Sequence, residues 1–128
     1  MEAGGDFADM VEELPEQIVA TVRKMILLLS EKRYTDIVTW TGGERLSETA
    51  IERAIVDYDV TVVEPPSLFY PNMINALRIE NSSPQKWSVI FPLWTVEEGE
   101  SDLSVDLTCT EGDGQVCANV RLNDIHVM

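Results

Sequence analysis

The sequence predicts an α+β domain in which N-terminal helices pack on a curved antiparallel sheet. Three observations support this fold class. Apolar residues recur at helical spacings before residue 60, three runs rich in Val, Leu, Ile and Trp follow from Trp87 onwards, and acidic, Gly-containing breaks separate those runs. An order of elements in which helices precede a bent antiparallel meander is typical of α+β domains, where the helices cover one face of the sheet. We expect the sheet to wrap into a cone.

Three helical segments are predicted in the first half of the chain. The first spans about residues 15–30, because Pro15 suits a first helical position and one apolar stripe follows it. One or two helical turns are expected over residues 31–40, before a pair of glycines. Ser47 is placed to cap the third helix, in the stretch SETAIERAIVDY.

The middle of the chain is predicted to hold two short strands. A β-rich run over residues 59–64 stops at two prolines. The loop SLFYPN follows, and its Leu68, Phe69 and Tyr70 are expected to plug one end of the core. A second strand is predicted over about residues 74–80.

The last third predicts a three-stranded antiparallel meander. Its first strand is apolar on both faces, which indicates a central strand covered on both sides, with Pro92 marking a bulge. A shift in the alternation at Asn123 and Asp124 predicts a second bulge. The simplest register places one apolar row opposite another, with Leu103, Val105, Leu107 and Cys109 facing Val116, Ala118, Val120 and Leu122.

The length of 128 residues indicates one domain, over residues 14–128, after a flexible acidic stretch at 1–13. No apolar run reaches the roughly 18 residues that a membrane helix needs. The start of the sequence is acidic and has no signal-peptide pattern, so we expect a cytoplasmic protein.

No metal or cofactor site is predicted. The simplest register puts Cys109 opposite Val116 and Cys117 on the other face, which favours two reduced thiols over a disulfide. His126 is the only histidine, and no zinc-ligand spacing occurs. P-loop, dinucleotide, nucleophile-elbow and HExxH motifs are absent, so no enzyme class is indicated.

The charge balance favours a basic partner. The chain has 23 acidic and 9 basic residues, a formal net charge of -14. Such a charge repels nucleic acid and anionic membranes and attracts basic proteins. Solubility alone can also explain an acidic composition, and this alternative stays open.

The simplest register also predicts a polar ladder on the second face of the sheet. It pairs Asp102 with Asn123, Ser104 with Arg121, and Asp106 with Asn119. The ladder is flanked by further acids, Glu97, Glu98, Glu100 and Asp124. It could bind Arg and Lys side chains of a partner, or it could be an ordinary solvated sheet face.

Two further features admit both a functional and a structural interpretation. Asp124 and His126 share a face of a regular strand and could form an oriented general base, although a histidine near a C-terminus is usually structural. Six aromatics could line a cavity for a small ligand or fill the core: Tyr34, Trp40, Tyr58, Trp87, Phe91 and Trp94.

The C-terminal third also resembles a known family. The strings PLWTVEEGESDLSVDLT and NDIHVM resemble small uncharacterised bacterial domains that close with W-T-x-E-E-G-x-S-D-L and D-I-H-V. The helix stretch LSETAIERAIVDY extends the resemblance to residues 15–128. The order of elements is similar to that of nuclear transport factor 2. Family members are similar to small acidic proteins found beside toxin genes.

The resemblance implies a non-enzymatic immunity protein that occludes a basic toxin domain. The residues expected to bind that partner are Glu97, Glu98, Glu100, Asp102, Asp106, Arg121, Asp124 and His126. Some motif residues could instead build the fold, with Ser101 and Asp102 capping the turn and Asp124 holding backbone amides. The alternatives are a cone-shaped domain that binds or converts a small molecule, and a structural module that forms a homodimer.

Overall fold

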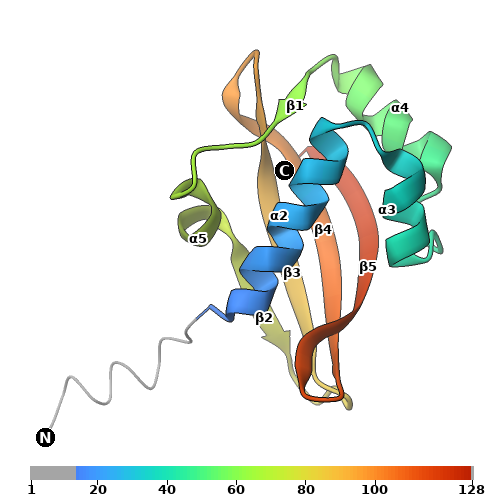
Figure 1. Cartoon of the computed structure of the whole chain (residues 1–128), viewed down its shortest axis with the longest axis vertical. Coiled ribbons are helices and arrows are strands. Elements are labelled where there is room, and N and C mark those ends of the chain that lie inside the picture. The colour runs from blue at the N-terminus through green and yellow to red at the C-terminus, as the bar shows by residue number, and fades with distance from the viewer. Residues whose placement is uncertain (1–13, 128) are drawn as a thin grey trace, which may run out of the picture.

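The computed structural model describes residues 14–127 and confirms the predicted fold class. All helices of this part of the chain lie on one face of a curved antiparallel sheet, with α2 running along its middle (Figure 1). The helices are α2 (Glu16–Ser30), α3 (Tyr34–Thr41), α4 (Glu48–Tyr58) and α5 (Phe69–Met73). The strands are β1 (Val62–Val63), β2 (Asn75–Ile79), β3 (Lys86–Thr95), β4 (Gly99–Gly112) and β5 (Gln115–Val127). The stretch 1–13, predicted to be flexible, lies outside the described residues.

Strand β3 is the centre of the sheet. The strand order is β1-β3-β4-β5, and β2 pairs with β3 as well. Strand β1 pairs with the end of β3, where Val62 lies opposite Thr95, and β2 pairs with its first half, where Asn75 lies opposite Ile90. The predicted meander therefore corresponds to β3, β4 and β5.

The helix predictions are confirmed. Helix α2 buries the apolar stripe that includes Ile18, Val22 and Met25, because these residues recur on the side that faces the sheet. The hydroxyl of Ser47 accepts a hydrogen bond from the amide of Ala50 at 3.2 Å and caps α4. Among residues 14–127, no helix is both long and apolar enough to cross a bilayer.

The segment after β1 departs from its prediction. It contains the short helix α5 rather than a loop, and β1 has only two residues. Tyr70 is buried and stacks on Phe91 with ring centroids 5.4 Å apart, so it plugs the core as expected. Leu68 is 75% exposed, so its predicted place in the core is wrong. The turn that begins α5 directs the side chains of Phe69 and Tyr70 toward the core and leaves that of Leu68 in solvent.

Strand β3 is covered on one face only. Trp87, Val89 and Phe91 are buried on the helix side, while Ile90 on the other side is half-buried. The prediction that both faces of this strand are covered is wrong, because the helices of residues 14–127 lie on one face of the sheet. The bulge at Pro92 is confirmed, since the register with β4 shifts between Pro92 and Trp94.

The predicted register of β4 with β5 is wrong by four residues. Leu122 lies opposite Leu107 rather than Leu103. The physical reason is the turn at Asp113 and Gly114, where both residues have positive φ and pairing starts directly on either side, followed by a break in the ladder. Ala118 lies in this break and is exposed, although it was predicted in the buried row.

A second register shift between β4 and β5 confirms the predicted C-terminal bulge. It falls between Leu122 and Asp124 on β5, so Asn123 is the extra residue. Because of this extra residue, the apolar residues that follow it again lie on the helix side of the sheet and the polar ones on the other side. Ile125 is therefore buried on the helix side, opposite Val105.

Candidate functional site

The second face of the sheet carries no helix within residues 14–127, and we call it the open face (Figure 1). The alternation of side chains along each strand and the register between strands show which side chains lie on the open face. On β2 and β3 these include Leu77, Ile79, Ser88 and Ile90, and on β4 and β5 they include Ser104, Asp106, Thr108, Asn119, Asn123, Asp124 and His126. Leu77 is 63% exposed, so the face is apolar along β2 and polar along β5.

The predicted polar ladder exists on the open face, but its pairs differ from those predicted. Ser104 lies opposite His126 rather than Arg121, and Asp106 lies opposite Asp124 rather than Asn119. Asn123 is the bulge residue and does not face Asp102. Its side-chain amide donates hydrogen bonds to Asp106 at 3.3 Å and to Thr108 at 2.8 Å.

The other predicted acids gather at one end of the sheet, in the connection from β3 to β4 and on the first residues of β4. This segment, which we call the acidic hairpin, contains Glu97, Glu98, Glu100 and Asp102. No Lys or Arg occurs between residues 87 and 120. Val96 stands beside these acids with 68% of its surface exposed.

Hydrogen bonds within the molecule hold the acidic hairpin in shape. Both carboxylate oxygens of Glu97 accept hydrogen bonds from Thr61, one from the amide at 2.8 Å and one from the hydroxyl at 2.9 Å. These bonds lower the pKa of Glu97. Ser101 donates its hydroxyl to Glu98 at 2.7 Å and accepts the amide of Leu103, which confirms that Ser101 caps the turn.

Glu100 and Asp102 differ from their neighbours. Both side chains are exposed, and within residues 14–127 neither forms a hydrogen bond or an ion pair. The predicted capping role of Asp102 is not seen there. These two carboxylates are therefore available to a partner, whereas Glu97 and Glu98 stabilise the hairpin.

The predicted residues on β5 are engaged within the molecule. Arg121 forms an ion pair with Glu44 at 2.7 Å. Asp124 accepts the amide of Ile125 at 2.9 Å, which confirms that it holds the backbone of the bulge. Its other oxygen lies 3.3 Å from Nδ1 of His126, as the shared face predicts.

The Asp124–His126 pair lies on the open face, and within residues 14–127 the buried Nδ1 of His126 forms no hydrogen bond. Ser104 opposite His126 is buried between neighbouring side chains. Within residues 14–127, no group of His, Cys, Asp and Glu side chains could hold a metal ion.

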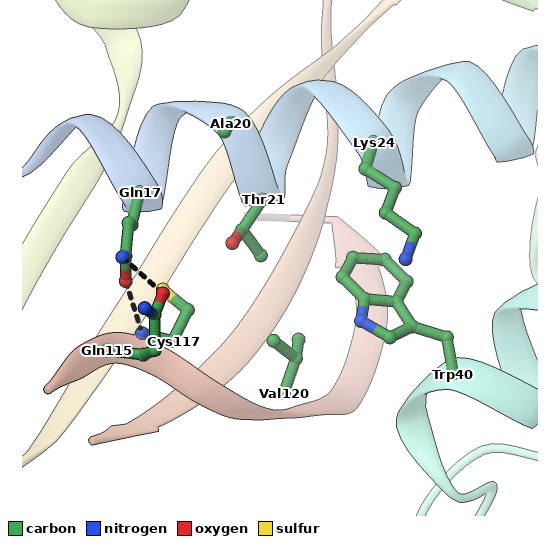
Figure 2. A pocket seen from close by; sticks show the side chains of 8 residues that line it. All are labelled: Gln17, Ala20, Thr21, Lys24, Trp40, Gln115, Cys117 and Val120. Atoms are coloured by element: carbon green, nitrogen blue, oxygen red, sulfur yellow. Dashed lines mark hydrogen bonds between the residues drawn. The ribbon is translucent and has the colours of Figure 1, made fainter. Parts of the chain in front are cut away.

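The six aromatics do not converge on one cavity. Tyr34, Trp87 and Phe91 are buried in the core, and Trp94 packs edge-on against Phe69 with centroids 4.8 Å apart. Trp40 instead lines a groove between α2 and β5, where Nζ of Lys24 lies 4.2 Å from the ring centroid (Figure 2).

This groove has a volume of about 260 Å³ and is lined by one thiol, that of Cys117, whose place sequence reasoning missed (Figure 2). Cys109 on β4 is fully buried in the core. Cys109 lies opposite Val120 rather than Val116, and Cys117 lines the groove together with Thr21 of α2. The prediction that Cys117 points to the other face is therefore wrong, whereas both thiols are free as predicted.

Gln17 of α2 positions the strand segment that carries Cys117. Its side-chain oxygen accepts the amides of Val116 at 2.5 Å and Cys117 at 3.1 Å, and its nitrogen donates to the side chain of Gln115 (Figure 2). These amides lie in the break of the β4–β5 ladder. The helix thus replaces the strand partner that the break removes, and fixes the cysteine at the end of the groove.

Together, the fold and its surfaces define a small acidic α+β domain with an uncovered sheet face and a stiff acidic hairpin. Residues 26–128 match the model of a family described as a domain of unknown function, DUF7668, and the chain belongs to this family. No match to a curated protein or to a solved structure was found.

Proposed function

We propose that this chain is a non-enzymatic binding protein whose acidic hairpin engages a basic protein partner. The observation that carries the proposal is the hairpin itself. It presents the free carboxylates of Glu100 and Asp102, with no Lys or Arg between residues 87 and 120. Opposite charges speed the encounter of two proteins and select the partner.

The rigidity of the hairpin supports this role. Contacts from Thr61 and Ser101 fix the backbone before any partner arrives, so little conformational entropy is lost on binding. Exposed Val96 offers an apolar contact at the same place. Asp106, Asp124 and His126 lie further along the open face and would extend the contact area, while Arg121 stays paired with Glu44.

The partner class that we propose is a basic toxin domain, which makes the chain an immunity protein. The resemblance of its C-terminal motifs to those of small acidic proteins beside toxin genes supports this choice. The proposed setting is the cytoplasm, where two free thiols stay reduced.

The test is affinity capture from the native host at low and high salt, with mass spectrometry of the captured proteins. We expect a basic protein that is released by salt and lost, by roughly tenfold or more, in the double variant Glu100→Lys, Asp102→Lys. The matched control is Glu52→Lys, Glu80→Lys, which makes the same charge change at two exposed acids outside the hairpin. Equal capture by both variants would contradict the proposed site.

A growth assay separates an immunity protein from other binding proteins. Expression of the captured partner alone should arrest growth, and co-expression of the wild-type chain should restore it. The hairpin double variant should restore growth poorly. A captured partner that is harmless when expressed alone would remove the immunity role and leave a binding protein of another kind.

A homodimer is the second candidate, favoured by exposed Leu77 and half-exposed Ile79 on the open face. Such a dimer would bury the apolar part of that face. Its test is the molar mass across a range of concentrations, compared with that of Leu77→Ser. A constant monomer mass would exclude this candidate and leave the first one intact.

A further inference from the structure

Helix α2 has a side that no other helix or strand covers within residues 14–127 (Figure 1). Its apolar stripe packs on the sheet, and the residues opposite that stripe are exposed at spacings of three and four. We call this side the outer face of α2, and its exposed residues are Glu16, Ala20, Arg23, Lys24 and Leu27. It points away from the sheet and so lies opposite the open face.

A groove runs along each side of the outer face. The first has a volume of about 360 Å³, lies between α2 and α5, and has the apolar residues Leu14, Val19 and Pro71 in its lining. The second is the groove between α2 and β5 (Figure 2). Ala20 lines both grooves, so the smallest side chain of α2 forms the ridge between them.

Two cations of the outer face have no anionic partner in the part of the chain that the structure describes. The guanidinium carbon of Arg23 lies 4.3 Å from the ring centroid of Tyr70, and Nζ of Lys24 lies 4.2 Å from that of Trp40. Neither cation forms an ion pair among residues 14–127. Arg23 lines the first groove and Lys24 the second, so each groove has a cation whose N–H donors are free for a carboxylate.

We propose that the outer face of α2 is a docking surface for an amphipathic helix of a partner protein, in which acidic residues flank an apolar stripe. Apolar side chains of that helix enter the two grooves, and its carboxylates bind Arg23 and Lys24. This surface is separate from the acidic hairpin and does not depend on the proposed function.

The shape of the surface favours a helix as the occupant. Packed helices lie about 8–10 Å apart, and the side chains at their crossing decide how closely they approach. Ala20 leaves room for such an approach, and Leu27, 38% exposed, extends the apolar contact by two turns along α2. The grooves on either side of the ridge receive side chains that recur at spacings of three and four.

The charges on the surface select an acidic helix. Arg23 and Lys24 lie together near the middle of α2, and Glu16 lies about two turns before them on the same face. Carboxylates of the partner therefore belong beside the two cations and away from Glu16. An anionic membrane or a nucleic acid fits less well, because both are repelled by the net charge of -14 and two cations neutralise few phosphates.

The experiment titrates the full chain into a labelled synthetic helical peptide, with Leu and Phe on one face and Glu beside them, and follows fluorescence anisotropy. We expect saturable binding that salt weakens, and roughly tenfold weaker binding by the double variant Arg23→Glu, Lys24→Glu. The matched control is Arg45→Glu, Arg53→Glu, which makes the same charge change at two exposed cations outside the outer face. Ala20→Gln places a larger neutral side chain on the ridge and should also weaken binding, although no charge is lost.

Several results would overturn the proposal. These are no saturable binding of the peptide by the wild-type chain, equal binding of a matched peptide with Lys in place of Glu, or an equal loss in the double variant and its control. Because the wild-type chain alone can give the first two results, poor folding of a variant does not protect the proposal. Circular dichroism checks that each variant keeps its fold.

Two further measurements test other occupants of the outer face. Tighter binding of the chain to phosphatidylglycerol vesicles than to the peptide would assign the face to a membrane. A wild-type chain that dimerises with rising concentration, while Ala20→Gln stays a monomer, would assign it to a second copy. Either result would overturn the partner helix.

Discussion

The side chain of Gln17 accepts the backbone amide of Cys117 at 3.1 Å, and so joins α2 to a strand segment 100 residues away in the sequence. The same oxygen accepts the amide of Val116. A break in a β-ladder leaves amides without partners, and such amides are costly where water reaches them poorly. One glutamine thus lets β5 depart from regular pairing at this point.

Replacement of this glutamine should destabilise the fold. Gln17→Ala leaves both amides without their acceptor, and we expect a loss of about 1–3 kcal/mol in the free energy of unfolding. Urea denaturation measures this loss. The control is Gln115→Ala, which removes only the partner of the Gln17 side-chain nitrogen and should change stability little. Equal effects of the two variants would contradict the bracing role of Gln17.

The contact between Thr61 and Glu97 predicts a dependence of stability on pH. The folded-state pKa of Glu97 is lowered, so its contribution is complete above the ordinary Glu pKa of about 4.3 and disappears as the pH falls through the lower folded-state value. Glu97→Gln should therefore lower the melting temperature at pH 7, and the difference from wild type should shrink in acid.

Glu100→Gln is the matched comparison within the same hairpin. It removes an exposed carboxylate that has no internal partner in residues 14–127, and its melting temperature should stay near that of the wild type at every pH. If the melting temperatures of Glu97→Gln and the wild type differ by the same amount from pH 7 into acid, the Thr61 contact does not make stability depend on the protonation of Glu97.

Much of the fold was predictable from the sequence, but the register of the last hairpin was not. Apolar alternation has a period of two, so a shift of four residues keeps every side chain on its face. The alternation therefore indicated the correct rows on β4 and β5 while it paired Leu122 with the wrong leucine. The turn dipeptide Asp113-Gly114 carried the missing information, since it fixes where pairing starts.

The candidate sites were predictable to different degrees. Glu100 and Asp102 are exposed as expected, because charged side chains at the start of β4 stay in water. The roles of Arg121 and Asp124 depend on contacts that only the fold shows, with Glu44 and the Ile125 amide. The place of Cys117 in the groove beside α2 was hidden because it depends on a break in the ladder, which alternation does not reveal.

Removal of one buried hydroxyl should stabilise the protein. Within residues 14–127 the hydroxyl of Tyr70 has no hydrogen-bond partner, and burial raises its pKa. Tyr70→Phe keeps the stacking on Phe91 and removes the unsatisfied group, so we expect a gain of up to about 1 kcal/mol. Thermal denaturation tests this, with Tyr58→Phe on α4 as the neutral control. A clear loss of stability would show that the hydroxyl has a partner after all.

The bulge amide on the open face should also matter for stability. Asn123→Ala removes the hydrogen bonds to Asp106 and Thr108 and leaves Asp106 directly opposite Asp124, where like charges repel. We expect a loss of about 1 kcal/mol in urea denaturation. Asn119→Ala, at an exposed position on the same strand, should cost less. If Asn119→Ala proves the more costly of the two, the bridging role of Asn123 is excluded.

The irregular path of β5 has a consequence for how copies of the chain behave when crowded. Within residues 14–127, β5 is an outer strand, with β4 on one side and no strand on the other. An outer strand offers unpaired amides and carbonyls to any similar strand, which is a route to aggregation. Its two register shifts divide β5 into short regular stretches, so a second copy finds no long straight edge to extend. The irregularities that misled the register prediction thus protect the chain from edge-to-edge polymerisation.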